Sequence, residues 1–566
     1  MVSPVSIRTD GCITRGEAVG QLPDNLPALI EQSAARFGER PAIVDGPTTL
    51  SYEELAGRVR QLSRALVANG VCAGDRVSIW SPNTFHWVIA ALAAHRAGAI
   101  LVPLNTRFTG PEARDILSRS SVRVLFVPDG FLGRDFLELL RESCEDTTNA
   151  DRDQTTPAGP VLGLPELQLV VKIPVEGLPE GPLGQGVKTW HDMLGNGEDL
   201  PDAEAAPLNG DSVCDILFTS GTTGRPKGAV STHRQTIAVA ASWADCAEVT
   251  ERDVYLIINP FFHSFGYKAG WLVGLLMGAT IVPVLKFDLD STLETIARER
   301  VTILPGPPTV FYSLLAHPRR DEYDMSSLRI AVTGSAPVPV ALIERMRREL
   351  SFETILTAYG LSEAVVVTMC RPDDTPETIS QTSGCAVTDF EVRIADESGR
   401  VLGPGEDGEI QLRGPNIMVG YLDDPAATAA AYTDDQWFRS GDIGHMDERG
   451  YVTITDRLKD MFTTGGFNVY PAEVEDAILS LDGIIECAVI GSPDDRLGEI
   501  GLAFVRSNRD PAPTEQQIIE HCRTRLANFK VPRRVVLVED LPHSAAGKVL
   551  KRELRESAPV LVSQAG

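Results

Sequence analysis

The stretch Thr219-Ser-Gly-Thr-Thr-Gly-Arg-Pro-Lys-Gly228 decides the interpretation of this chain, and it directly follows the apolar run 215–218. Serine and threonine hydroxyls, with backbone N–H groups that glycine leaves accessible, form a concave donor surface that suits phosphate oxygens. Lys227 adds a positive charge nearby. The GxxxxGK[S/T] spacing of a Walker A loop is absent. A flexible Gly/Thr turn is the alternative, but this whole run after a strand favours a phosphate-binding loop.

On both sides of this loop, short apolar runs alternate with amphipathic segments. A helix is predicted over 83–98, between strands over 76–80 and 99–105, and a capping box at Ser51 and Glu54 begins an earlier helix. Strand, helix and strand in this order predict βαβ units around a parallel sheet. Apolar runs continue the alternation at 215–218, 253–259, 280–285, 301–306 and 328–334.

The pattern changes toward the C-terminus. Residues 388–455 are rich in turns and short strands, as in a small β-barrel or a distorted sheet, and helices and strands mix from residue 457 onward. We therefore predict an α/β protein. Its large N-terminal domain, residues 1–456, would hold parallel and mixed sheets, helices and a small β-barrel-like subdomain, and residues 457–566 would form a mobile C-terminal α+β domain. The polar residues 143–165 are expected to form a mobile surface loop.

The composition disfavours several classes of protein. The 566 residues carry a formal net charge of −26, which argues against nucleic acid and anionic membranes as partners, because both require a basic face. The longest uncharged apolar stretch, 270–285, is shorter than the ~20 residues that cross a bilayer. Nine scattered cysteines without a CxxC pair, and an N-terminus without an apolar signal segment, indicate a cytoplasmic protein with free thiols.

Two further segments carry groups that suit a nucleotide. In the run TAYGLSE, the ring of Tyr359 can stack on a purine, while Ser362 and Glu363 can hold a phosphate and its Mg²⁺, a hard ion that prefers oxygen ligands. In the run WFRSGDI, Asp442 can accept both hydroxyls of a ribose. Each residue alone would be interpreted as part of an exposed turn. These residues indicate a nucleotide site because they occur together in one chain.

Basic residues near the C-terminus complete the set. Arg457 can contact the same ribose, and Lys459 lies where the composition changes, as a hinge would. Lys548 ends the Gly-containing run LPHSAAGK. A lysine on such a loop in a separate module can be carried into a site as a point charge. A solvated surface lysine is the alternative for Lys548.

Together these five segments, in this order and over residues 25–556, resemble the adenylate-forming superfamily: acyl-CoA synthetases, adenylation domains of peptide synthetases, and luciferases. The resemblance implies two half-reactions. A carboxylate attacks the α-phosphate of ATP with Mg²⁺ present, which gives an acyl-AMP and pyrophosphate. The C-terminal domain then rotates, and a thiol such as that of CoA attacks the activated carbonyl.

The resemblance also implies a role for each residue. Lys548 and Glu363 would serve adenylation, the first by neutralising charge and the second by holding Mg²⁺. His263 would be a gate between the nucleotide and acyl sites, with a histidine in an aromatic core as the alternative, and Lys459 would be the hinge. Nucleotide contacts are implied for Thr219, Ser220, Gly221, Thr222, Thr223, Gly224, Lys227, Gly334, Ser335, Ala336, Pro337, Tyr359, Gly360, Ser362, Asp442 and Arg457, and contacts with the CoA arm for Gly465, Gly466 and Phe467.

The acid is harder to identify from the sequence. Phe261, Phe262 and Tyr267, with the valine run 365–367, suggest a medium-sized apolar cavity for a cyclic, bicyclic or medium-chain acid. Runs such as NPFFHSFGYKAG resemble a group of actinobacterial acyl-CoA ligases of steroid catabolism, which act on an indane propionic acid. His543 stands where arginine is common in the superfamily.

The acceptor is also open at this stage. An acid–CoA ligase is the main hypothesis, and transfer of the acyl group to an amine or to a carrier protein are the alternatives. The CoA phosphates would need basic residues, and the sequence offers Arg523, Arg525, Lys530, Arg533 and Arg534. The run LANFKVPR also fits a structural motif of the C-terminal fold. The expected ligands are ATP, Mg²⁺, CoA and a small carboxylic acid. A homodimer is one expectation, since dimers are common in similar families.

Overall fold

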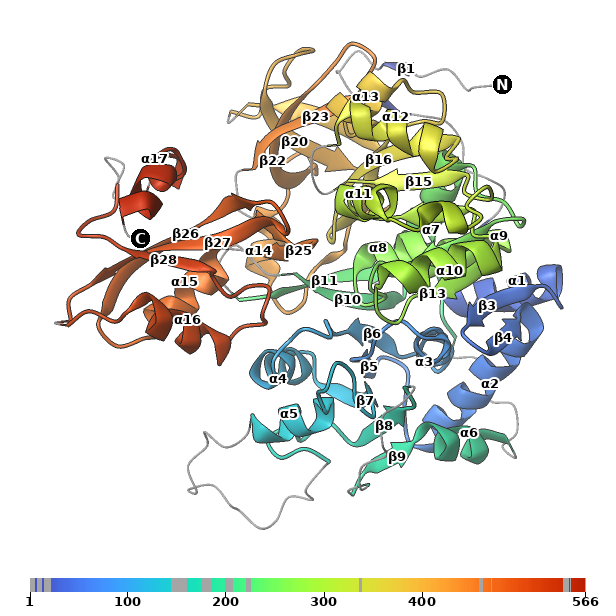
Figure 1. Cartoon of the computed structure of the whole chain (residues 1–566). Coiled ribbons are helices and arrows are strands. Elements are labelled where there is room, and N and C mark those ends of the chain that lie inside the picture. The colour runs from blue at the N-terminus through green and yellow to red at the C-terminus, as the bar shows by residue number, and fades with distance from the viewer. Residues whose placement is uncertain are drawn as a thin grey trace. The chain divides into compact units, whose positions relative to one another are not determined.

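The computed structural model (Figure 1) divides the chain into two compact units. It describes residues 6–7, 13–14, 22–143, 160–175, 183, 185–198, 207–219, 225–334, 338–396, 398–457, 462–469, 471–509, 511–542, 549 and 551–564. The first unit comprises Met1–Thr106, Leu117–Leu217 and Gly228–Asp456, and the second comprises Arg107–Ile116, Phe218–Lys227 and Arg457–Gly566. The second unit thus also takes in two short segments from the N-terminal part of the chain.

Two large sheets form most of the first unit. In the part of the chain that is described, the eight-stranded sheet has the order β21 (Gly420–Tyr421), β11 (Lys227–Thr232), β10 (Val213–Thr219), β6 (Ile100–Pro103), β5 (Arg76–Ile79), β7 (Val122–Pro128), β8 (Leu169–Ile173), β9 (Val187–Thr189). The nine-stranded sheet has the order β18 (Cys385–Ala386), β17 (Ala364–Met369), β16 (Thr354–Leu361), β15 (Ile330–Thr333), β14 (Ile303–Pro305), β12 (Val254–Ile257), β13 (Thr280–Pro283), β3 (Pro41–Asp45), β4 (Thr48–Ser51).

The central strands of both sheets are parallel, as the βαβ pattern predicts. Strand β5 pairs in parallel with β6 and β7, and β12, β14, β15 and β16 form a parallel run, while the edge pairs β16–β17 and β3–β4 are antiparallel. A third sheet, with the order β1 (Ser6–Ile7), β2 (Ile13–Thr14), β19 (Glu391–Ala395), β20 (Gly408–Arg413), β22 (Phe438–Met446), β23 (Val452–Arg457), fulfils the prediction of short strands over 388–455. The predicted α/β class with mixed sheets is confirmed.

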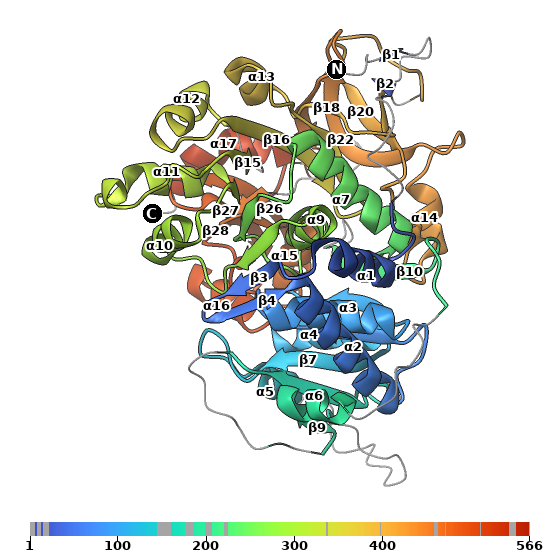
Figure 2. The ribbon, with the colours of Figure 1, turned by 90° about the vertical axis from the view of Figure 1, so that its right-hand side faces the viewer.

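Helices join and cover these sheets (Figure 2). The first unit holds α1 (Leu26–Phe37), α2 (Tyr52–Ala68), α3 (Phe85–Arg96), α5 (Phe136–Glu142), α6 (Trp190–Glu198), α7 (His233–Ala247), α8 (Ser264–Gly266), the π-helix η1 (Tyr267–Trp271), α9 (Leu272–Met277), α10 (Leu289–Glu299), α11 (Pro308–Ala316), the 3₁₀ turn η2 (Arg320–Glu322), α12 (Val340–Glu349), α13 (Pro376–Gln381) and α14 (Pro425–Ala430). Helix α4 (Gly110–Arg119) lies mostly in the second unit. The predicted capping box forms at the start of α2, where Ser51 accepts from the Glu54 N–H and Glu54 accepts from the Ser51 N–H.

Helix α3 lies at the centre of the first unit. Its apolar run is buried from His86 to His95, and it packs against α1, α2 and strands of both large sheets (Figure 2). Trp87 is fully buried and lies edge-on to Trp271 and Phe261. Burying each large apolar side chain contributes about 1.5–3 kcal/mol, so α3 is a main source of the cohesion between the sheets.

The second unit is a smaller α+β body. Its sheet has the order β25 (Phe467–Val469), β24 (Phe462–Thr464), β27 (Gly498–Ser507), β26 (Ile484–Asp494), with β28 (Arg534–Leu537) paired to β27. Helices α15 (Pro471–Leu479) and α16 (Glu515–Arg523) supply buried residues to one core, and α17 (Lys551–Gln564) supplies buried residues to another. The predicted C-terminal mixture of helices and strands is confirmed.

No helix in the described part of the chain is both long and apolar enough to cross a membrane. The described cysteines Cys72, Cys214, Cys246, Cys370, Cys385, Cys487 and Cys522 are free thiols, and all but Cys72 are buried. The predicted surface loop falls mainly on residues 144–159, which lie outside the described residues.

The buried histidine His86 gives the fold a predicted acid sensitivity. Its ring stacks on Phe85 at 3.8 Å and meets Trp190 edge-on at 4.8 Å, and burial lowers its pKa from 6.5 to about 4. The unfolded chain therefore takes up this proton near pH 6.5, while the folded chain takes it up only near pH 4. The contribution of His86 to the free energy of unfolding is complete above about pH 6.5. It falls by about 1.4 kcal/mol per pH unit as the pH drops from about 6.5 to about 4.

The slope of the unfolding free energy against pH measures how many protons the chain takes up on unfolding. We expect His86→Phe to lower this number by about one between pH 6.5 and 4.5. Urea unfolding at several pH values measures the slope. The control is His191→Phe on α6, because His191 is exposed and its replacement should leave the slope unchanged. Equal slopes for His86→Phe and the parent would contradict the assignment.

Candidate active site

Several predicted residues gather where parallel strands of the nine-stranded sheet end. Gly334 follows β15, Tyr359 lies near the end of β16, and His263 follows β12. Thr333 and Thr357 are paired in register, and a Cβ placed on Gly334 would lie 3.6 Å from the Ala358 carbonyl. Ligands of open α/β sheets bind outside the carboxyl ends of the strands. This edge is therefore the candidate site of the first unit.

Tyr359 and Asp442 are directly bonded, although 83 residues separate them. The Tyr359 hydroxyl donates to Asp442 Oδ2 at 2.5 Å, and the Asp442 N–H donates to Ser440 Oγ at 3.0 Å. Asp442 lies on β22, so this bond joins the nine-stranded sheet to the six-stranded sheet. The bond orients the carboxylate, whose two oxygens can each accept more than one hydrogen bond and so can also receive a ligand hydroxyl.

Glu363 lies in the turn between β16 and β17 and is half-buried. Its Oε1 accepts a hydrogen bond of 2.9 Å from the Tyr421 hydroxyl, and its carbonyl accepts from the Met418 N–H at 2.7 Å. A carboxylate held in place in this way fits Mg²⁺, which takes one or two protein carboxylates and completes its shell with phosphate oxygens and water. The sequence did not point to Tyr421, because nothing local links it to Glu363.

The turn around Gly360 leaves no room for a side chain. A Cβ at this position would lie 2.5 Å from the Val366 backbone nitrogen and 3.1 Å from the Ala364 carbonyl oxygen. Val366 itself has φ = +57°, a left-handed conformation that is costly for a β-branched residue. The Asn416 side chain donates to the carbonyls of Val365 and Val366 at 3.3 and 3.1 Å and supports this geometry. The backbone just before Glu363 is thus fixed by contacts that only glycine permits.

We expect Gly360→Ala to destabilise the protein by about 2 kcal/mol, because the new methyl group meets backbone atoms that cannot move aside. The comparison is Gly57→Ala in helix α2, where a Cβ meets nothing within 4 Å. That change should stabilise the protein by about 0.5–1 kcal/mol, since alanine is the better helix former. Chemical unfolding of both variants tests the pair. A Gly360→Ala variant as stable as the parent would show that the turn can widen.

His263 caps the short helix α8. Its Nδ1 accepts from the Phe265 N–H at 3.3 Å, which places the proton of the neutral ring on Nε2. The residue is exposed to solvent, yet desolvation by the surrounding protein lowers the pKa of its imidazole below the ordinary value. His263 is therefore neutral near pH 7 and offers an N–H donor.

The loop before His263 is held by a residue that the sequence did not suggest. Asn83 accepts from the Phe261 N–H at 2.7 Å and donates to the Asn259 carbonyl at 2.9 Å. A Cβ on Gly266 would lie 2.2 Å from the Pro260 carbonyl, so the chain folds back tightly here. A buried asparagine before a helix has too general a sequence context to reveal this role.

The apolar residues predicted to form the acyl cavity are mostly core residues. Phe261 and Tyr267 are fully buried and pack around Trp87, and Val365, Val366 and Val367 are buried in strand β17. Phe262 is only partly buried. The aromatic cluster therefore forms the core behind the His263 segment.

The remaining nucleotide residues are described only in part. Thr219 ends β10, and its hydroxyl donates to the carbonyl of Lys227, the first residue of β11, at 3.4 Å. Arg457 is placed by its backbone on β23, and Ser362 lies in the turn before Glu363. The other predicted nucleotide contacts lie outside the described residues: Ser220, Gly221, Thr222, Thr223, Gly224, Ser335, Ala336 and Pro337. The predicted hinge Lys459 and the predicted catalytic Lys548 lie outside them as well.

The predicted CoA residues lie in the second unit. Gly465 and Gly466 form the β24–β25 turn with φ of +58° and +83°, and Phe467 stacks on Phe529 at 4.8 Å. Lys530, proposed from the sequence as a contact for the CoA phosphates, is buried and binds Glu473 at 2.7 Å and Glu112 at 2.9 Å. For Lys530 the structure therefore supports the alternative, a structural role of the LANFKVPR run, because the side chain is buried and two carboxylates already neutralise its charge.

Comparisons with known proteins identify the family of this chain. The AMP-binding enzyme family matches residues 30–422, and the AMP-binding enzyme C-terminal domain matches residues 473–548. A Rhodococcus jostii protein named 3-[(3aS,4S,7aS)-7a-methyl-1,5-dioxo-octahydro-1H-inden-4-yl]propanoyl:CoA ligase is 50% identical over 94% of this chain and 99% of its own. A Mycobacterium tuberculosis protein of the same name is 48% identical over 94% of this chain and 98% of its own.

Solved structures show the same fold. The amide bond synthetase McbA from Marinactinospora thermotolerans has a TM-score of 0.79 and 26% identity, and covers 94% of this chain and 99% of its own. The o-succinylbenzoate CoA synthetase from Bacillus subtilis has a TM-score of 0.77 and 26% identity, and covers 93% of this chain and 98% of its own. The chain belongs to the AMP-binding enzyme family, which is the adenylate-forming superfamily that its motifs resemble.

Proposed function

We propose that this protein is an AMP-forming acid–CoA ligase whose acid is a propanoate carried on a fused six- and five-membered ring system. The observation that carries this proposal is the 50% identity, over nearly the full length of both chains, to a ligase named for a methyl-dioxo-octahydroindenyl propanoate. ATP and CoA are its co-substrates. The residues at the strand ends supply the groups that this chemistry needs.

In the first half-reaction, an oxygen of the acid carboxylate bonds to the α-phosphorus of ATP, and the bond from that phosphorus to pyrophosphate breaks. This step requires charge neutralisation and alignment, and no covalent group of the protein. Asp442 would hold the ribose hydroxyls, with its orientation fixed by Tyr359. Glu363 would hold Mg²⁺, which neutralises phosphate charge when bound. Lys548 would neutralise the charge that develops on the phosphate.

His263 would orient the acid. Its ring is neutral, and its Nε2–H can donate to a carboxylate oxygen while the other oxygen attacks phosphorus. In the second half-reaction, the CoA sulfur bonds to the carbonyl carbon, and the bond to the AMP oxygen breaks. The thiol proton leaves to solvent and AMP is released. The turn at Gly465 and Gly466 would give the thin CoA arm room to pass the backbone.

The test is a panel of acids incubated with Mg²⁺ and ATP: indane propanoates, cycloalkane carboxylates, benzoates, and straight chains of four to sixteen carbons. Each acid is run with CoA, without CoA, and with amino acids in place of CoA, and products are identified by mass. We expect the bicyclic acid to give the CoA thioester and straight chains to react weakly. If amides form and no CoA thioester does, the proposal that CoA is the acceptor is wrong. If straight-chain acids react faster than the bicyclic acid, the proposed acid is wrong.

Two finer expectations accompany this function: the protein acts in the cytoplasm, and it forms a homodimer. Dimers are common in similar families, and sedimentation of the purified protein gives its mass directly. A monomer at micromolar concentration would remove the second expectation and leave the chemistry unchanged.

A further inference from the structure

An ion pair is buried in the interior of the first unit. Lys268 Nζ lies 2.9 Å from Asp215 Oδ1, and neither side chain is more than 2% exposed. Lys268 also donates to Ser231 Oγ at 3.0 Å, and the Thr236 hydroxyl donates to Asp215 Oδ2 at 2.9 Å. Both charges are therefore paired and hydrogen-bonded, as burial requires.

The pair connects two segments that bear on the candidate active site. Asp215 lies on β10, four residues before Thr219, where the phosphate-binding motif begins. Lys268 lies on η1, five residues after His263. The η1 segment is a π-helix with a break at Gly270, where φ is −105° and ψ is −107°. Irregular helical turns of this kind are frequent at functional sites.

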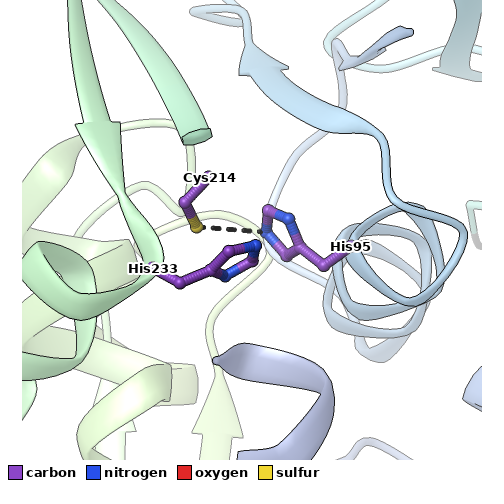
Figure 3. Close-up of side chains that lie close together, drawn as sticks. All are labelled: His95, Cys214 and His233. Atoms are coloured by element: carbon purple, nitrogen blue, oxygen red, sulfur yellow. Dashed lines mark hydrogen bonds between the residues drawn. The ribbon is translucent and has the colours of Figure 1, made fainter. Parts of the chain in front are cut away.

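Neutral polar side chains lie beside the pair, and Figure 3 shows three of them, His95, Cys214 and His233. The Tyr267 hydroxyl lies 3.3 Å from His95 Nε2 and 3.6 Å from Cys214 Sγ, and Cys214 Sγ lies 3.9 Å from His95 Nε2. Burial lowers the pKa of His95 well below 6.5 and that of His233 to about 4, and raises the pKa of the Cys214 thiol. The two histidines and the thiol therefore stay uncharged at neutral pH and do not replace either member of the pair.

The three side chains of Figure 3 could in principle hold a metal ion, since their ligand atoms lie within 4.8 Å of one another. Two of their hydrogen bonds compete with metal binding, although His233 Nε2 is buried without a hydrogen-bond partner among the described residues. His233 Nδ1 accepts from the Leu26 N–H at 3.4 Å, and His95 Nε2 shares a hydrogen bond of 3.3 Å with the Tyr267 hydroxyl. Metal binding would also require the buried thiol to lose its proton, which its raised pKa opposes. The cluster is better understood as neutral packing around Asp215 and Lys268.

Buried ion pairs add little stability on balance, because desolvation offsets their attraction, but they fix one geometry. We propose that Asp215 and Lys268 are positioning residues that hold the His263–η1 segment in register with β10. This inference rests on the proposed adenylation function. Its consequence is that losing both charges should slow acyl-AMP formation more than it weakens ATP binding, because the acid would lose its alignment.

The test uses the full-length double variant Asp215→Leu with Lys268→Met, which removes both charges and leaves neither unpaired. The matched control is Asp129→Leu with Lys172→Met, another buried pair of the first unit, with its closest N–O distance 3.7 Å; Lys172 also lies 3.9 Å from Asp135, which is exposed to solvent. Acyl-AMP formation is measured with whichever acid the parent turns over fastest, and amide hydrogen exchange is followed over residues 260–272. Lys268→Arg tests rescue, since it keeps the positive charge.

For the Asp215/Lys268 double variant we expect at least a tenfold fall in kcat for acyl-AMP formation, a KM for ATP within threefold of the parent, and at least tenfold faster exchange over 260–272. The control pair should change none of these, and Lys268→Arg should keep more than a third of the activity. Parental kcat and parental exchange in the double variant would overturn the proposal. A parent that adenylates no acid would instead refute the proposed function, and the exchange measurement would still decide the positioning role.

Discussion

Replacing Lys548 with alanine is expected to lower the rate of acyl-AMP formation by roughly 10²–10³-fold, the usual effect of removing one group that stabilises charge in a transition state. The sequence run that ends at Lys548 supports this prediction, since the residue lies outside the described part of the structure. The expected loss is in kcat, because the lysine acts on charge that develops during the reaction. Pyrophosphate release with saturating acid and ATP measures it.

The second half-reaction separates this role from a general loss of structure. Given preformed acyl-AMP and CoA, Lys548→Ala should form thioester at a rate within about threefold of the parent. Lys286→Ala, at an exposed lysine after β13, is the matched control and should leave both half-reactions unchanged. Equal losses in both half-reactions would contradict a role confined to adenylation.

Replacing Asp442 with alanine is expected to raise the KM for ATP by roughly 30-fold or more. A hydrogen bond to a charged group contributes about 1.5–3 kcal/mol, and the change also removes the carboxylate to which the Tyr359 hydroxyl donates. Initial rates at varied ATP concentration give KM and kcat separately. Asp434→Ala, at an exposed aspartate just before β22, should behave as the parent.

The Tyr359–Asp442 bond allows a sharper version of this test. Tyr359→Phe alone removes the bond but keeps the carboxylate, so we expect a rise in KM of about threefold to tenfold. When Tyr359→Phe and Asp442→Ala are combined, the increase in KM for ATP should be less than the product of the two single increases, since the two residues share one interaction. Strict additivity would mean that Tyr359 does not act by orienting Asp442.

Local features of the fold could be predicted because short-range rules govern them. The capping box of α2, helix α3, the parallel strands β5, β6, β12 and β15, and the change to an α+β module all follow from the periodicity of apolar residues and from turn chemistry. The family followed from the order of five motifs. These features depend on neighbours within a few residues, or on the order of segments along the chain, and both are written in the sequence.

The partners of individual side chains could not be predicted. Three side-chain hydrogen bonds join residues far apart in the sequence. They link Tyr359 with Asp442, Tyr421 with Glu363, and Lys530 with Glu473, which are 83, 58 and 57 positions apart. Phe261 and Tyr267 were expected around the acyl cavity and are core residues. Which side chains meet depends on sheet order and strand register, and a shift of one residue in register turns every side chain to the opposite face.

The sequence by itself determined the α/β class and the adenylate-forming family, and it predicted which residues would hold phosphate, ribose and Mg²⁺. Only the tertiary structure decided that Asp442 is oriented by Tyr359, that Glu363 is held by Tyr421, and that a buried Asp215–Lys268 pair ties β10 to the segment after His263. The physical reason is that residue type limits the chemistry a side chain can perform, while its orientation and charge pairing are set by packing between distant strands.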